Sequence, residues 1–162
     1  MKKNWLKFQR LLIVDDEPDI LETLEELLPM CDVVKASSFE EAKDLLEVQY
    51  FDIAVLDIMG VNGYKLLEIA NKRKIMAVML TAHALSPEET AKSYKEGAAY
   101  YVPKGKMSEI TTYLNDILEA KEQGKKLWSR WFDRFALYYD ERFGPDWKDT
   151  DKDVWNRIQG DI

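Results

Sequence analysis

Five short apolar runs alternate, over the first 120 residues, with longer segments in which apolar residues recur at helical spacing. Continuous apolar runs indicate strands that are buried on both faces, as in parallel sheets covered by helices. The repeated order of strand and helix predicts a doubly wound α/β fold around one five-stranded parallel sheet. The expected strands cover residues 11–14, 33–34, 53–56, 75–80 and 99–102.

Residues that are typical of helix starts and helix ends occur between these apolar runs. Pro18 is suited to the first turn of a helix, and Ser86-Pro87 supplies a cap followed by a proline at the first helical position. Gly97 is typical of a helix C-terminus. The last of the five helices is expected over residues 110–120.

Composition narrows the class of protein. The net charge of −7 disfavours nucleic acid and anionic membranes as partners, and no apolar run approaches the roughly 20 residues of a membrane span. The single cysteine, Cys31, cannot form an internal disulfide, and the charged N-terminus lacks the apolar core of a signal peptide. We therefore expect a soluble, cytoplasmic protein.

Polar side chains follow several of the expected strands. Asp15 and Asp16 follow the first, Asp57 the third, Thr81 the fourth, and Lys104 comes soon after the fifth. The carboxyl ends of parallel strands share one edge, so these side chains are expected to converge. Clustered carboxylates suit Mg²⁺, and a carboxylate beside such a metal can attack a phosphoryl group. A hydroxyl and an ammonium could then bind the phosphoryl oxygens.

The sequence resembles the receiver domain of two-component response regulators, which have a CheY-like fold. The resemblance runs from about residue 9 to about residue 121. It rests on Leu-Ile-Val-Asp-Asp-Glu-Pro at 12–18, Ala-Val-Leu-Asp-Ile-Met at 54–59, Met-Leu-Thr-Ala at 79–82 and Gly-Ala-Ala-Tyr-Tyr-Val-Pro-Lys at 97–104.

The resemblance implies a role for each matched residue. Asp57 would be the phosphoacceptor, phosphorylated by a histidine kinase, a phosphotransfer protein or a small phosphodonor. Tyr101 would be the aromatic switch, turning inward when Thr81 shifts toward the phosphoryl group. Thr81 and Lys104 would bind the phosphoryl group. Mg²⁺ would be bound by Asp15, Asp16, Asp57 and the backbone carbonyl of Met59.

Two features depart from the family pattern. Gly63 follows Asp57 by six residues instead of about eight, so the loop after the phosphoacceptor is shortened by two. Gly105, where the family has proline, follows Lys104, so the peptide bond between them is expected to be trans. His83, the only histidine, is interpreted as a passive rim residue; the alternative is that it makes the phosphate lifetime depend on pH.

The C-terminal region differs in composition from the rest. We divide the chain into a receiver domain over 1–122 and an aromatic-rich helical extension over 123–162, with helices at 125–142 and about 151–158. Nine Lys/Arg balance nine Asp/Glu over residues 121–162, so a DNA-binding output domain is not expected. The aromatic stripe of the first helix either folds back onto the receiver or forms a homodimer or partner surface.

The function expected from these residues is a phosphorylation switch that signals to a protein partner, and not a conventional enzyme. A regulator that relays phosphate onward is the nearest variant. A Mg²⁺-dependent aspartyl-phosphate phosphatase is disfavoured because Met59 stands where such enzymes carry a second aspartate. A non-catalytic pseudo-receiver scaffold is disfavoured by the intact set of Asp57, Thr81 and Lys104.

Overall fold

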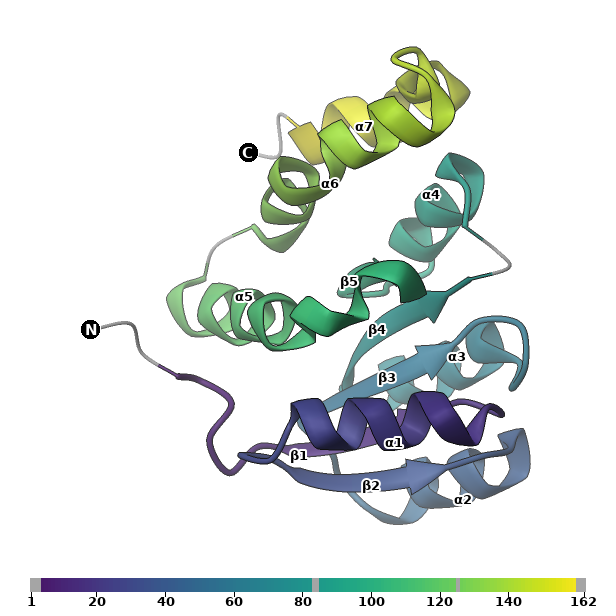
Figure 1. Cartoon of the computed structure of the whole chain (residues 1–162), viewed down its shortest axis with the longest axis vertical. Helices are drawn as coiled ribbons and strands as arrows, with labels where there is room; N and C mark the ends of the chain where they lie inside the picture. The colour runs from purple at the N-terminus through teal and green to yellow at the C-terminus, as the bar shows by residue number, and fades with distance from the viewer. Residues whose placement is uncertain (1–3, 83–84, 125, 160–162) are drawn as a thin grey trace.

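The computed structural model describes residues 4–82, 85–124 and 126–159, and it contains one five-stranded parallel sheet (Figure 1). The strand order is β2-β1-β3-β4-β5. The predicted α/β fold is therefore confirmed. The strands are β1 (Arg10–Val14), β2 (Asp32–Ala36), β3 (Ile53–Asp57), β4 (Met76–Thr81) and β5 (Tyr100–Pro103).

Helices cover both faces of the sheet, as the doubly wound prediction requires. Helices α1 and α5 pack together on one face, whereas α2, α3 and α4 lie on the other (Figure 1). Ser38 and Ser86 cap α2 and α4 by accepting hydrogen bonds from backbone N–H groups three residues later. The helices are α1 (Pro18–Leu27), α2 (Phe39–Val48), α3 (Gly63–Lys72), α4 (Pro87–Lys95) and α5 (Ile110–Gln123).

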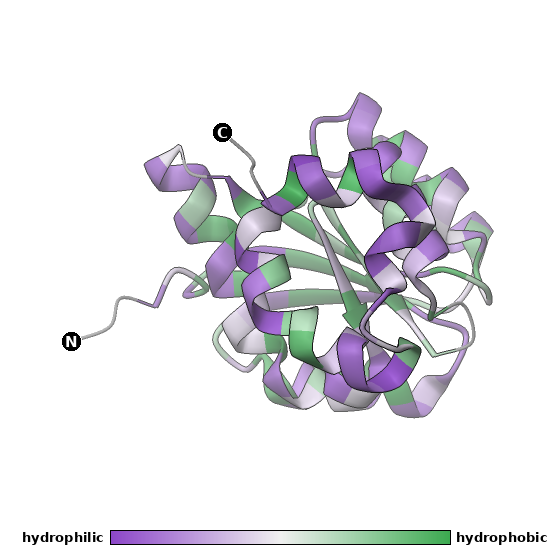
Figure 2. Cartoon of the chain, turned by 90° about the horizontal axis from the view of Figure 1, so that it is seen from above, coloured by the Kyte–Doolittle hydropathy of each residue, from purple (hydrophilic) through white to green (hydrophobic). Residues whose placement is uncertain are grey.

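The central strands form the core. Every residue of β3 is buried, and hydrophobic residues gather on the strands while hydrophilic residues occupy much of the outer helix surface (Figure 2). The strand β2 is longer than expected, because residues 32 and 35 at this sheet edge are polar and exposed and so interrupt the apolar run. The β4 strand is displaced by one residue from its expected range, to 76–81.

The C-terminal segment after α5 folds back onto the sheet and its helices. It contains α6 (Leu127–Phe143), the 3₁₀ helix η2 (Trp147–Asp151) and α7 (Lys152–Gln159), and α6 lies against α5 and β5 (Figure 1). The helix expected over 125–142 thus begins at Leu127, and Lys125 lies outside the described residues. Four aromatic residues of α6 are buried in the same hydrophobic core as the sheet: Trp128, Trp131, Phe135 and Tyr139. This packing supports the folded-back alternative.

Two tryptophans of α6 satisfy carbonyl groups at the edge of the sheet. Trp128 Nε1 donates to the carbonyl of Ala98 at 3.0 Å, and Trp131 Nε1 donates to the carbonyl of Tyr101 at 2.8 Å. β5 has a strand neighbour on one side only, so its other edge would present unpaired backbone groups. The extension therefore covers an edge that would otherwise be open to pairing with another chain.

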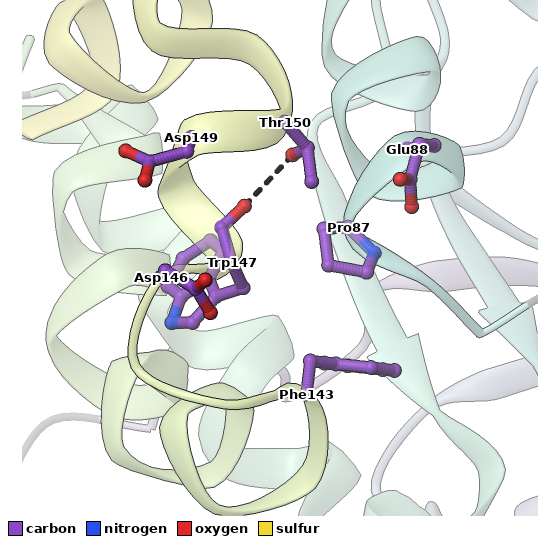
Figure 3. Close-up of a pocket in the computed structure, with 7 residues that line it drawn as sticks. All are labelled: Pro87, Glu88, Phe143, Asp146, Trp147, Asp149 and Thr150. Atoms are coloured by element: carbon purple, nitrogen blue, oxygen red, sulfur yellow. Dashed lines mark hydrogen bonds between the residues drawn. The ribbon is translucent and has the colours of Figure 1, made fainter.

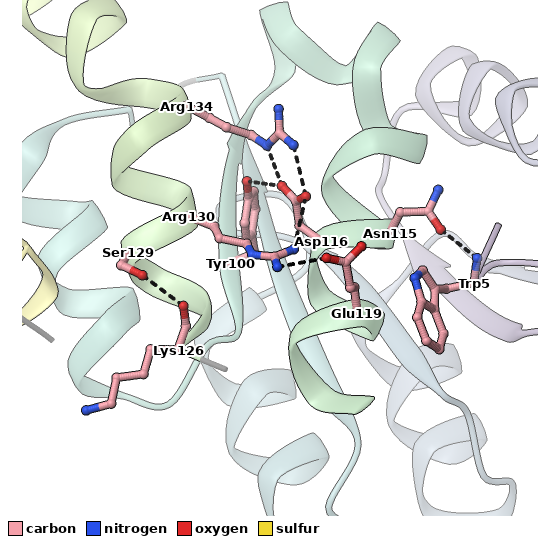
Figure 4. A network of polar contacts seen from close by, with 9 residues as sticks. All are labelled: Trp5, Tyr100, Asn115, Asp116, Glu119, Lys126, Ser129, Arg130 and Arg134. Atoms are coloured by element: carbon pink, nitrogen blue, oxygen red, sulfur yellow. Dashed lines mark hydrogen bonds and ion pairs between the residues drawn. The ribbon is translucent and has the colours of Figure 1, made fainter. Parts of the chain in front are cut away.

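A buried carboxylate ties α6 to α5. The guanidinium of Arg134 contacts both carboxylate oxygens of Asp116, and the hydroxyl of Tyr100 donates to the same group at 3.3 Å (Figure 4). Arg130 pairs with Glu119 at 2.8 Å one turn away. Because Asp116 is buried, loss of its partners would leave an uncompensated charge, so these contacts fix the position of α6.

The 3₁₀ helix η2 also lies against α4. A cavity of about 470 Å³ separates the first turn of α4 from η2 (Figure 3). At the other end of α4, Lys95 forms an ion pair with Asp151 of η2 at 2.6 Å. The cavity is lined by Pro87, Glu88, Phe143, Asp146, Trp147, Asp149 and Thr150.

Cys31 is expected to be an unreactive thiol. It is half-buried, its Sγ donates to the carbonyl of Leu6 at 3.4 Å, and burial with the nearby charge of Asp52 raises its pKa to about 11. A raised pKa leaves little thiolate at pH 8. Alkylation by iodoacetamide at pH 8 should be at least about tenfold slower than that of glutathione. Equal rates in a mass-spectrometric time course would contradict this environment.

Among the described residues, no helix combines the length and apolar character that a membrane crossing requires.

Candidate functional site

The predicted site residues lie at the carboxyl edge of the sheet. Asp57 is the last residue of β3 and Thr81 the last of β4, while Asp15 directly follows β1 and Lys104 directly follows β5. The register explains the alignment, because Val14 is level with Leu56 and Asp57 is level with Leu80. The strand order reverses between β1 and β3, where open α/β sheets place their ligands.

Lys104 joins the carboxylates. Its Nζ lies 2.9 Å from Asp15 Oδ2, 3.3 Å from Asp57 Oδ1 and 3.0 Å from Glu17 Oε1. Only 8% of its side chain is exposed. Residues that are 89 positions apart in sequence thus meet in one charged cluster, as the strand-end argument predicted for Asp15, Asp57 and Lys104.

The charges of this cluster influence one another. Burial alone would lower the pKa of Lys104, but its hydrogen bond to Glu17 and the negative charges of Asp15 and Asp57 raise that pKa above the ordinary value. Burial raises the pKa of Asp15, while the backbone N–H of Glu17 and the ammonium of Lys104 act in the opposite direction. Lys104 therefore stays charged across the physiological range.

The loop after Asp57 is compact, as its shortened sequence indicates. The N–H of Gly60 donates to Asp57 Oδ2 at 3.0 Å, which leaves Oδ1 to Lys104. The N–H of Gly63 donates to the carbonyl of Ile58 at 2.9 Å, and Asn62 adopts a left-handed conformation with φ 55°. A Cβ on Gly63 would lie 2.4 Å from the carbonyl oxygen of Asp57, so this close approach requires glycine.

The carboxylates around Asp57 suit a hard divalent cation. Asp15 Oδ2 is buried and makes no hydrogen bond within the described part of the chain, although it lies in the ion pair with Lys104. Asp15, Asp16 and Glu17 can bring carboxylate oxygens within 4.8 Å of one another. A Cβ on Gly60 would lie 2.2 Å from Asp16 Oδ1 and 2.7 Å from Asp57 Oδ2, so glycine keeps the space between them open. This donor set fits Mg²⁺.

The other residues singled out in the sequence differ in their exposure. Thr81 and Tyr101 are buried, whereas the side chain of Met59 is 64% exposed. No cis peptide bond occurs among the described residues, so the Lys104–Gly105 bond is trans, as expected. His83 lies outside the described residues.

Two residues of the site, Glu17 and Gly60, were not predicted from the sequence. Glu17 pairs with Lys104, although only its place after Asp15 and Asp16 hinted at this. Gly60 lies against both Asp16 and Asp57, and its place in the loop was the only available signal. Both contacts depend on side-chain direction, which spacing along the chain does not specify.

A doubly wound five-stranded parallel sheet with an aspartate at its switch point has the architecture of a receiver-type domain. The family model described as the response regulator receiver domain matches residues 11–115, which is more than half of the chain. The chain therefore belongs to the response regulator receiver family. The resemblance stated from the motifs is confirmed.

Curated relatives match the same region. The heme response regulator HssR of Staphylococcus aureus (strain Newman) is 41% identical over 99 residues, which are 57% of this chain and 43% of HssR. The Arabidopsis thaliana two-component response regulator ARR18 is 35% identical over 101 residues, which are 59% of this chain and 16% of ARR18. The match thus spans less than half the length of either relative.

Solved structures share the fold. A CheY-like receiver domain protein from Methanospirillum hungatei JF-1 has a TM-score of 0.66 at 26% identity, covering 73% of this chain and 99% of that one. The BeF₃-activated DrrB receiver domain has a TM-score of 0.61 at 27% identity, covering 69% of this chain and 98% of that one. In both cases the similarity covers nearly all of the other chain.

Proposed function

We propose that this protein is a phosphorylation switch of a two-component or phosphorelay system, with Asp57 as phosphoacceptor. The observation that carries the proposal is the cluster in which Lys104 lies within 3.3 Å of Asp57 and 2.9 Å of Asp15. Family membership supports this proposal, because receiver domains act as such switches. We also propose that a histidine kinase or a phosphotransfer protein supplies the phosphoryl group.

The chemistry assigned to Asp57 is nucleophilic. A carboxylate oxygen attacks phosphorus, and a new P–O bond forms as the P–N bond of a phosphohistidine, or the P–O bond of a small donor, breaks. The ammonium of Lys104 neutralises one phosphoryl oxygen, and the hydroxyl of Thr81 donates to another. Positioning and charge neutralisation are the main requirements of phosphoryl transfer, and these residues supply both.

Mg²⁺ is the proposed cofactor. Asp15, Asp16 and Asp57, with the backbone carbonyl of Met59, would hold the ion, which when bound offsets negative charge that develops on the phosphoryl oxygens. The carboxylates of this chain would determine where the ion binds, and Gly60 keeps the space between two of them free. The division into a receiver over 1–122 and an extension over 123–162 also belongs to the proposal.

The test is intact-protein mass spectrometry after incubation with acetyl phosphate and Mg²⁺. A gain of about 80 Da is expected in the wild type, because one phosphoryl group is added to a carboxylate. Asp57→Asn retains the shape of the side chain but lacks the nucleophilic charge, so it should show no gain. Removal of Mg²⁺ with a chelator should also abolish the adduct.

The alternative functions predict different results in this experiment. Release of inorganic phosphate without an adduct would favour the aspartyl-phosphate phosphatase. Neither adduct nor release would favour the pseudo-receiver scaffold and would contradict the switch. An adduct that persists in Asp57→Asn would assign the phosphoryl group to another residue.

A further inference from the structure

The extension contacts the residue proposed as the aromatic switch. Tyr101 is fully buried, and both Thr90 of α4 and the backbone of Ser86 lie close enough to its hydroxyl to influence the pKa of that group. Its backbone carbonyl accepts from Trp131 Nε1 at 2.8 Å. Tyr101 therefore has Thr90 of α4 beside its side chain and Trp131 of α6 on its main chain.

Thr90 connects the switch residue to the extension. Its Oγ1 donates to the carbonyl of Ser86 at 2.7 Å and lies 2.6 Å from the hydroxyl of Tyr139, which belongs to α6. Because the single proton of Thr90 is used toward Ser86, its oxygen accepts from Tyr139. Tyr139 thus donates to the hydroxyl of Thr90, which lies beside the side chain of Tyr101.

The phenol protons needed for this arrangement are retained. Burial raises the pKa of Tyr139 well above its ordinary value, and burial also raises that of Tyr101. Both phenols stay protonated at physiological pH and can act as donors. In a buried site a lost donor leaves its partner unsatisfied, so each hydroxyl matters to the position of the others.

The rest of the extension makes Tyr139 a rigid support. Its ring lies edge-on to Trp131 at 5.1 Å and to Trp147 at 5.0 Å, and Trp155 of α7 stacks on Trp131 at 6.0 Å. The Lys95–Asp151 ion pair ties α4 to η2 on the same side. Displacement of Tyr101 from its buried position would therefore disturb contacts that belong to the docked extension.

From this arrangement we infer that Tyr139 is a positioning residue for Tyr101, and that docking of the extension and phosphorylation of Asp57 strengthen each other. The inference rests on the proposed switch function, in which Tyr101 turns inward on phosphorylation. Tyr101 is already fully buried while the extension is docked, so both events favour a buried position of this side chain. Coupling of this kind is reciprocal: each event raises the affinity of the other by the same factor.

The experiment compares the wild type with Tyr139→Phe, which keeps the ring and removes the hydroxyl. Beryllofluoride with Mg²⁺ serves as the phosphoryl mimic, and its dissociation constant is measured by titration. Loss of one neutral hydrogen bond should weaken binding by about two- to tenfold in Tyr139→Phe. In the wild type, beryllofluoride should slow hydrogen exchange of the α6 amides, and this effect should shrink in the variant.

Tyr138→Phe is the matched control. Tyr138 precedes Tyr139 on α6, and the structure gives it ring contacts but no hydroxyl hydrogen bond among the described residues. It should bind beryllofluoride like the wild type. Thr90→Val removes the connecting hydroxyl, so Tyr139→Phe should have no additional effect in that background.

The outcomes separate the two proposals. A wild type that fails to bind beryllofluoride overturns the switch function and this inference with it. A wild type that binds, together with an equal or tighter dissociation constant for a folded Tyr139→Phe, overturns the inference alone. A loss in Tyr138→Phe as large as that in Tyr139→Phe would assign the effect to packing of α6 and would also overturn it.

Discussion

Replacing Trp131 with alanine is expected to lower the free energy of unfolding by about 3–5 kcal/mol, the usual range for a buried tryptophan. Trp131 is fully buried and stacks on Phe135 at 5.5 Å and on Trp155 at 6.0 Å. Its indole also donates to the carbonyl of Tyr101. Alanine would leave a large cavity and an unsatisfied carbonyl at the sheet edge. Urea denaturation followed by far-ultraviolet circular dichroism measures the loss.

Leu137→Ala provides the control on the same helix. Leu137 is 76% exposed, so its truncation should change stability by no more than about 0.5 kcal/mol. A loss below about 1 kcal/mol in Trp131→Ala would contradict the packing of α6 on the receiver. It would instead favour the alternative in which the aromatic stripe serves a second copy or a partner.

The fold could be predicted because the central strands leave a strong pattern. A strand buried on both faces is a continuous apolar run, and β3 shows this over residues 53–56. The edge strand β2 was predicted only in part, because Asp32 and Lys35 are exposed to solvent and interrupt its apolar run. The first and last residues of each strand depend on its pairing with neighbouring strands, and the pattern of apolar residues along the sequence does not reveal this pairing.

The direction of the extension could not be predicted from its aromatic content. An aromatic stripe at helical spacing has the same sequence whether its own chain or another molecule covers it. What decides the matter here is the fit of Trp128 and Trp131 to the carbonyls of Ala98 and Tyr101. Those acceptors lie 30 residues away, and nothing in the sequence marks them as unpaired.

The candidate site was predictable in outline for a different reason. The carboxyl ends of parallel strands lie at one edge of the sheet. Asp15, Asp57 and Lys104 follow or end such strands, so the strand order predicts that they lie close together. The detail of which oxygen faces which donor was not predictable. Asp57 uses Oδ1 for Lys104 and Oδ2 for the N–H of Gly60, a division that only the folded loop determines.

Replacing Gly60 with alanine is expected to reduce the rate of phosphorylation by acetyl phosphate by about 10²-fold, the usual consequence of misplacing a reacting group by about 1 Å. The added Cβ would lie 2.2 Å from Asp16 Oδ1 and 2.7 Å from Asp57 Oδ2. Both carboxylates must move away, so the phosphoacceptor and one proposed Mg²⁺ ligand leave their positions together. The initial rate of adduct formation by mass spectrometry is the measurement.

Stability should respond far less than the rate. The atoms nearest the added Cβ all belong to the side chains of Asp16 and Asp57, so the carboxylates can shift while the backbone stays in place, and the free energy of unfolding should change by less than about 1 kcal/mol. Gly105→Ala is the matched control, because a Cβ there meets nothing within 4 Å and that residue adjoins Lys104. It should phosphorylate like the wild type. A wild-type rate in Gly60→Ala would mean that the reaction does not need the space between Asp16 and Asp57, and the proposed metal ligands would have to be reassigned.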